Sequence, residues 1–79
     1  MLLFRIRNIK SGLYSVGGYN PRFTKKGKIW HGRGPFHGHL ALVGDRAKKA
    51  YADCVVEIIS IEDNPTCTVK FSDYLLINR

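Results

Sequence analysis

The sequence carries little negative charge, and the first fifty residues have almost none. Thirteen Lys and Arg residues stand against six Asp and Glu residues, which gives a formal net charge of +7. Residues 1–50 hold eleven of the basic residues and one acid, Asp45, whereas residues 51–79 hold two bases and five acids. A basic half of this kind favours association with phosphates, although it also fits a solvated face that keeps a small protein soluble.

Long apolar runs are also missing. No stretch approaches the roughly 20 apolar residues that a membrane-spanning helix needs, and Arg5 and Arg7 interrupt the apolar start where a signal peptide would be continuous. We therefore expect a cytoplasmic protein without a membrane partner. Cysteine is limited to Cys54 and Cys67. In a reducing compartment both are expected to be small buried hydrophobic residues rather than a disulfide.

What the chain does have is enough apolar material for one core. It is 79 residues long, 44% hydrophobic, and contains four Phe, four Tyr and one Trp. These features predict a single domain over residues 1–79 and argue against disorder. The length is near the lower end for an unaided core, so oligomerisation would be a natural reinforcement.

Short strands are predicted in the first third of the chain. Leu2–Asn8 alternates apolar residues with largely basic ones, which is the period of a strand with one buried face. Residues 13–16 are expected to return against it after a turn. Residues 22–24 and 28–30 are then predicted to pair across a turn at 25–27, which would place lysines at the tip of this hairpin.

A helix is predicted to follow. Pro35 suits the first helical position because its missing N–H would be unpaired there. Five apolar residues recur at helical spacing along one stripe: Phe36, Leu40, Val43, Ala47 and Tyr51. Gly44 weakens the helix, so a break is expected there, with Asp45 capping a second short turn.

The last third of the chain predicts further strands. Residues 54–61 are β-branched and nearly continuous in apolar character, which is typical of a strand buried on both faces. A turn at 62–65 leads to a hairpin partner at 66–71, and residues 74–77 are expected to form an apolar edge strand that pairs in a homo-oligomer. The fold class is therefore α+β: a small antiparallel sheet of four to six short strands with one helix packed on one face, in the order βββ(β)αββ(β).

Residues 17–34 are the most distinctive stretch. They combine five glycines, five Lys or Arg residues and three aromatic residues with no acid. Lys and Arg neutralise phosphates, glycine-rich loops offer backbone N–H groups to anions, and aromatic faces stack on bases for about 1–3 kcal/mol each. The simpler alternative is that Phe23 and Trp30 build the core under the hairpin. The predicted site for a phosphate-bearing nucleotidic ligand comprises Arg5, Arg7, Tyr19, Arg22, Lys26, Lys28, Trp30 and Arg33.

The remaining polar residues do not suggest a metal site or catalysis. His37 and His39 would point about 200° apart on a helix, and no carboxylate or cysteine near them or His31 completes a tetrahedral set. The acids in residues 57–63 stand far in sequence from a convincing nucleophile or paired base. We therefore expect no catalytic residues, no metal and no cofactor.

Several motifs resemble those of small uncharacterised bacteriophage proteins. They are Arg5-Ile-Arg, the run from Ser11 to Gly18, the run from Pro21 to Trp30, and His39-Leu40. The phage proteins show a similar pattern of G-L-[YF]-S-x-G-G, P-x-[FW]-[ST]-K-x-G-K-x-W and a downstream H-L. The resemblance covers about half the chain and implies a host-directed or counter-defence role, but no established activity. Three short strands before a helix also resemble, more loosely, plant-type AP2 and phage-integrase arm-binding domains, which lay a sheet on DNA.

Three classes of function follow. The first is a non-enzymatic binder, either a sponge that sequesters a nucleotide second messenger or a protein that holds nucleic acid along its basic face. The second is a protein–protein inhibitor of a host defence or nucleic-acid enzyme, whose partner would be a host protein. The third is a small nuclease-like enzyme.

Overall fold

The computed structural model describes residues 2–20, 22–61 and 66–77, and its α+β fold confirms the predicted class. The predicted turn at 62–65 lies outside the described residues. The elements follow in this order: β1 (Leu2–Asn8), β2 (Tyr14–Ser15), β3 (Phe23–Thr24), β4 (Trp30–His31), α1 (Arg33–Val43), the 3-10 turn η1 (Gly44–Arg46), α2 (Ala47–Ala50), β5 (Cys54–Ser60), β6 (Thr66–Lys70) and α3 (Phe71–Ile77).

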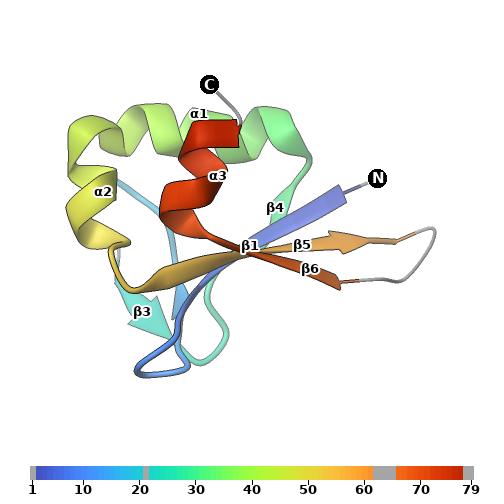
Figure 1. Cartoon of the computed structure of the whole chain (residues 1–79), viewed down its shortest axis with the longest axis horizontal. Helices are drawn as coiled ribbons and strands as arrows, with labels where there is room; N and C mark the ends of the chain where they lie inside the picture. The colour runs from blue at the N-terminus through green and yellow to red at the C-terminus, as the bar shows by residue number, and fades with distance from the viewer. Residues whose placement is uncertain (1, 21, 62–65, 78–79) are drawn as a thin grey trace.

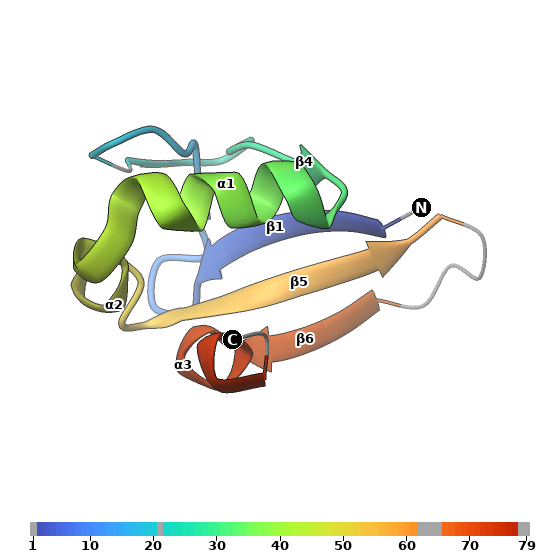
Figure 2. The same ribbon diagram turned by 90° about the horizontal axis from the view of Figure 1, so that it is seen from above.

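The strands form one antiparallel sheet. Its order is β3-β2-β1-β5-β6, and β4 pairs with β1 beside this path. β1 and β5 pair along their whole length, from Leu2 opposite Ser60 to Asn8 opposite Cys54. All three α-helices lie on the same side of the sheet, so its other face has no helix over it among the described residues (Figures 1 and 2).

The predicted hairpin between residues 22–24 and 28–30 is wrong. β3 pairs with β2, where Tyr14 lies opposite Thr24, and β4 pairs with β1. This arrangement brings Trp30 into the core, where only 3% of the residue is exposed. Burial of the Trp30 indole therefore determines that β4 pairs with β1. The turn at 25–27 does not determine the partner of β4.

The predicted helix is confirmed, including its break at Gly44. α1 begins at Arg33, before the predicted start at Pro35, and at Gly44, where φ is 63°, the chain changes to η1 and then α2. Four residues of the predicted stripe are buried, namely Phe36, Val43, Ala47 and Tyr51. The fifth, Leu40, is half-buried. The predicted cap at Asp45 is wrong, because this residue lies inside η1 and no side-chain hydrogen bond caps η1 or α2.

The C-terminal segment is a helix and not the predicted edge strand. Phe71, Tyr74 and Leu75 recur at spacings of three and one, which places them on one helical side against the core. The Phe71 ring lies 4.9 Å from that of Tyr51, and the Tyr74 ring lies 5.4 Å from that of Phe36. β6 is therefore one edge of the sheet. A homo-oligomer stays a prediction, but the apolar edge strand from which it was inferred is not present at 74–77.

Burial along β5 and β6 is less complete than predicted. In β5 the residues Cys54–Val56 are buried, whereas the rest of the strand is half-buried. Burial raises the pKa of the Cys54 thiol to about 11. Cys67 is exposed, so the prediction that both cysteines are buried is wrong for this residue, because β6 is at the edge of the sheet. None of the helices in the described ranges is long and apolar enough to cross a membrane.

Candidate functional site

The register of the strands separates two faces of the sheet. Phe4 and Ile6 are buried on the face that the helices cover, so the alternating residues Arg5 and Arg7 point to the helix-free face. Strand pairing extends this face into three rows: Thr24, Tyr14, Arg7, Val55 and Lys70, then Arg5, Glu57 and Thr68, then His31, Leu3, Ile59 and Thr66. We call these twelve residues the basic face. Its three Lys and Arg residues outnumber its one acid.

Arg5 is the most constrained cation of the basic face. Its Cζ atom lies 3.5 Å from the centroid of the Tyr14 ring, and one terminal nitrogen donates a hydrogen bond of 3.4 Å to the backbone carbonyl of Lys26. The Nε atom of Arg5 is buried and has no hydrogen-bond partner among the described residues. Arg5 is thus a planar cation that lies against an aromatic ring. Its Nε–H has lost its hydrogen bonds to water and has gained none within the described residues.

The one acid of the basic face is already paired. Nε of Arg7 donates a hydrogen bond of 2.9 Å to Oε2 of Glu57 from the neighbouring strand. Because the charges of Arg7 and Glu57 largely cancel each other, the positive field of the basic face comes mainly from Arg5 and Lys70. The backbone carbonyl of Lys26 contacts Arg5, which places the exposed residue Lys26 at the border of the face.

Two glycines of the 17–34 stretch are required by packing. Gly27 has φ of 62°, and a Cβ atom there would clash with the side chain and backbone of Tyr14, so glycine lets the 25–27 loop approach Tyr14 and sets Lys26 beside Arg5. At Gly17 (φ 77°) a Cβ atom would lie 2.9 Å from the Trp30 ring. The N–H of Gly17 donates to the Ser15 hydroxyl, so it is not available to an anion as the sequence suggested.

Only part of the predicted site gathers on this face. Arg5 and Arg7 belong to it and Lys26 borders it, whereas Lys28 and Trp30 line a cleft of about 480 Å³ whose walls include residues of β4 and α1. The Trp30 ring stacks on His39 with centroids 4.7 Å apart. Its burial supports the alternative that Trp30 builds the core.

The other predicted residues lie elsewhere. Tyr19 is 59% exposed, but Arg46 already stacks on its ring at 3.6 Å and donates to its backbone carbonyl. Arg33 begins α1, and its charge acts on the phenol of Tyr74, whose pKa is nevertheless raised because burial outweighs this charge. Arg22 is exposed immediately before β3. The eight predicted residues therefore do not converge on one pocket.

A buried polar chain was not predicted from the sequence. The Tyr51 hydroxyl lies 2.7 Å from both the Ser15 hydroxyl and Nε2 of His39. Burial raises the pKa of Tyr51 to about 12, and burial, followed by the charge of Lys28, lowers the pKa of His39. Near neutral pH this buried polar chain of Ser15, Tyr51 and His39 therefore holds the protonated phenol of Tyr51 and the neutral imidazole of His39.

One assignment of donors gives every hydroxyl proton of this network an acceptor. The Ser15 hydroxyl, which accepts from the N–H of Gly17, is assigned as donor to Tyr51, and the Tyr51 hydroxyl as donor to Nε2 of His39. This assignment satisfies each hydroxyl proton and places the imidazole proton on Nδ1. Ser15 is fully buried, so the chain joins β2 to the helices and is not an accessible nucleophile.

The remaining histidines do not form a metal site. His37 bonds through Nε2 to the hydroxyl of Tyr74 at 2.7 Å, which links α1 to α3, and His31 is exposed on β4. Within the described ranges, no three His, Cys, Asp or Glu side chains gather closely enough to hold a metal ion.

Comparisons of the chain with models of protein families, with curated proteins and with solved structures found no match. The helix-free face holds Arg5 against the ring of Tyr14 and places Arg7 and Lys70 in the same row of the sheet as that ring.

Proposed function

We propose that the protein is a non-enzymatic binder of nucleic acid, which lies along the basic face. The observation that carries this proposal is the guanidinium of Arg5, which lies over the ring of Tyr14 on a sheet face that no described helix covers. Arginine planes and aromatic rings stack on unpaired bases, and neighbouring cations neutralise phosphates. The basic face offers both kinds of group.

The shape of the basic face favours a polymer over a small nucleotide. A site for a small molecule is concave and buries most of its ligand, whereas the residues of this face are spread over a sheet surface that no described helix covers. Its cations are also spread over different strands, with Arg5 on β1 and Lys70 on β6. Threonine hydroxyls at positions 24, 66 and 68 provide further groups that can bond to phosphate or sugar oxygens.

A single strand fits this face better than a duplex. Stacking on Arg5 requires a base whose face is free, and the bases of a duplex are stacked on one another. Arg5, Lys26 and Lys70 would each neutralise about one phosphate. For single strands the logarithm of affinity falls by roughly 0.7 per neutralised phosphate for each unit of log salt, so we expect a slope of about −2.

The biological setting of this binding is part of the proposal. The motifs similar to those of phage proteins support a host-directed or counter-defence role in the bacterial cytoplasm. In that role the protein would cover or sequester single-stranded nucleic acid without a cofactor and without a chemical step.

The proposal is tested by fluorescence anisotropy with labelled single-stranded DNA, single-stranded RNA, a duplex and a cyclic dinucleotide over a series of salt concentrations. We expect tighter binding of a single strand than of the duplex or the cyclic dinucleotide, with the slope given above. Binding of the cyclic dinucleotide alone would favour a sponge. If none of these probes binds, a protein partner with an acidic surface replaces nucleic acid as the proposed ligand.

A further inference from the structure

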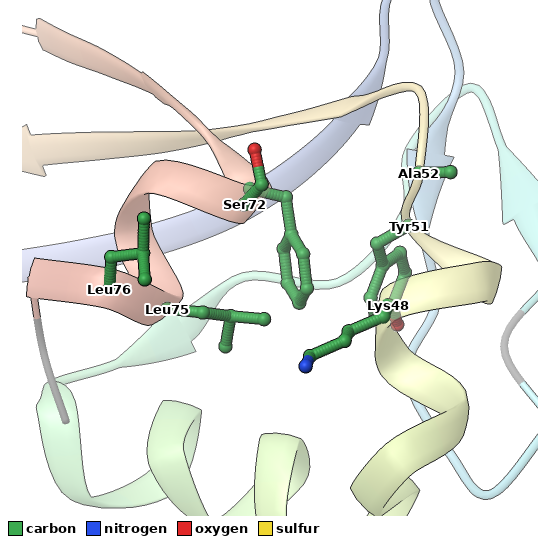
Figure 3. A pocket seen from close by; sticks show the side chains of 7 residues that line it. Lys48, Tyr51, Ala52, Ser72, Leu75 and Leu76 are labelled. Atoms are coloured by element: carbon green, nitrogen blue, oxygen red, sulfur yellow. The ribbon is translucent and has the colours of Figure 1, made fainter.

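A second candidate site lies on the helix side of the molecule, away from the basic face. It is a pocket of about 290 Å³ between α2 and α3. Figure 3 shows the side chains around it, which come from the end of α2 and from α3. The pocket shares no residue with the basic face, so a ligand bound here would be independent of nucleic acid.

The walls of this pocket are mainly apolar. They include the rings of Tyr51 and Phe71 and the side chains of Leu75 and Leu76. Tyr51 and Phe71 are 0% and 2% exposed, so their rings form the floor of the pocket, and the hydroxyl of Tyr51 is already bonded to Ser15 and His39. Leu76 is 68% exposed at the pocket. An apolar ligand that covered this leucine would remove apolar surface from water.

Lys48 is the one charged side chain among the described residues that line the pocket. It is exposed, and Figure 3 shows it extending from α2 toward Leu75 on α3. A single ammonium group is a compact positive charge, and it lacks the planar fork with which arginine binds phosphate. The charge thus selects an anion. Ser72 adds one hydroxyl to the lining, and one ammonium group with one hydroxyl suits a monoanion better than a phosphate.

We propose that the pocket binds a small amphiphilic carboxylate. Its apolar part lies against Leu75 and Leu76, above the floor formed by Tyr51 and Phe71, and its carboxylate pairs with the ammonium group of Lys48. The volume is at the lower end of the roughly 300–1,000 Å³ typical of small-molecule sites. A short-chain acid therefore fits it better than a large ligand does.

The chain-length dependence of binding tests this proposal. Straight-chain carboxylates from butanoate to decanoate, and primary alcohols of the same lengths, are titrated into the intact protein by isothermal calorimetry. We expect the affinity of the carboxylates to rise about fourfold for each added methylene group until the pocket is full. Carboxylates should bind up to about fivefold tighter than the matching alcohols, because an exposed ion pair contributes modestly.

Three variants at exposed positions assign the effect to this pocket. Lys48→Gln should lose the preference for carboxylates but keep the methylene increment, and Leu76→Ser should weaken every ligand. Lys49→Gln, the matched control, does not line the pocket and should bind like the parent. Thermal melting checks that all three fold.

Several results would overturn the proposal. They are equal binding of alcohols and carboxylates, an unchanged preference in Lys48→Gln, or no saturable binding of any chain. Amide chemical shifts locate the ligand: changes are expected at Ala52 and Leu76, and changes only at Thr68 on the basic face would also contradict it. Nucleic-acid binding by Lys48→Gln is measured in parallel, so that failure here is distinguishable from failure of the proposed function.

Discussion

The two faces of β1 differ in what they do for the molecule. On one face Phe4 and Ile6 are buried beneath the helices, and the Phe4 ring stacks on that of Phe36 at 4.8 Å. On the other face Arg5 and Arg7 remain half-buried beside a tyrosine and a glutamate. The comparison indicates that stability is concentrated on the helix side and that ligand binding is concentrated on the helix-free side. Each prediction below tests that separation.

The largest effect on stability is expected from Phe36→Ala. Phe36 is completely buried between β1 and α3. Loss of its ring should reduce the free energy of unfolding by about 3–5 kcal/mol, which is a large part of what a small domain has. Urea denaturation measures this loss. The control on the same helix is Leu42→Ala, where the side chain is 56% exposed and the change should stay within about 0.5 kcal/mol.

The buried hydroxyl of Tyr51 makes stability depend on alkaline pH. Its pKa is raised from 10.0 to about 12 in the folded protein, so the unfolded chain loses this proton first. The stabilisation is complete below pH 10 and is lost as the pH rises toward 12, by up to about 2–3 kcal/mol. Tyr51→Phe should be less stable at neutral pH, because Ser15 and His39 lose their partner.

The comparison between Tyr51→Phe and the parent isolates this titration. Cys54, whose pKa is raised to about 11, titrates in both proteins and provides a shared background. The variant should lose less stability than the parent between pH 10 and pH 12 in denaturant titrations. Parallel curves for the two proteins would show that Tyr51 does not titrate as described.

A smaller effect is expected at the loop that borders the basic face. Gly27→Ala combines a φ of 62° with a clash against Tyr14, and should cost about 1–3 kcal/mol. Gly18→Ala is the matched control, because Gly18 also has a positive φ, of 86°, but open space where a Cβ atom would be. Gly18→Ala should cost only about 1 kcal/mol. Thermal melting curves that showed equal losses would contradict the close approach of this loop to Tyr14.

Much of the fold could be predicted because long elements have readable periods. Alternation identified Leu2–Asn8, and the apolar stripe identified the helix and its break at Gly44. Two-residue strands have no period, so the partner of β4 could not be read from the sequence and depended on burial of Trp30 against the core. The spacing of Phe71 and Tyr74 is helical, but the alternation of Thr66–Lys70 runs into Phe71, so the sequence predicts a strand at 66–71 and an edge strand at 74–77 in place of this helix.

The candidate site was less predictable because it depends on strand register. Alternation placed Arg5 and Arg7 together, but Lys70 joins their face only through the pairing of β1, β5 and β6. No local pattern reports that pairing. The buried polar chain is similar, since Tyr51 is twelve positions from His39 and 36 from Ser15. Residues 17–34 are rich in positive charge, as the sequence shows, but the fold distributes these basic side chains over several surfaces.

The most direct test of nucleic-acid binding on the helix-free face compares two double variants of equal charge. Arg5→Gln with Lys70→Gln removes one arginine and one lysine from the basic face, and Arg46→Gln with Lys49→Gln removes one of each from the helix side. Affinity for a single-stranded oligonucleotide is measured against salt, and melting confirms that both variants fold. We predict that the first pair lowers affinity at least about tenfold and makes the salt slope shallower by about 1.4, and that the second pair changes both much less. Equal losses in the two variants would mean that only net charge matters and would contradict a specific binding face.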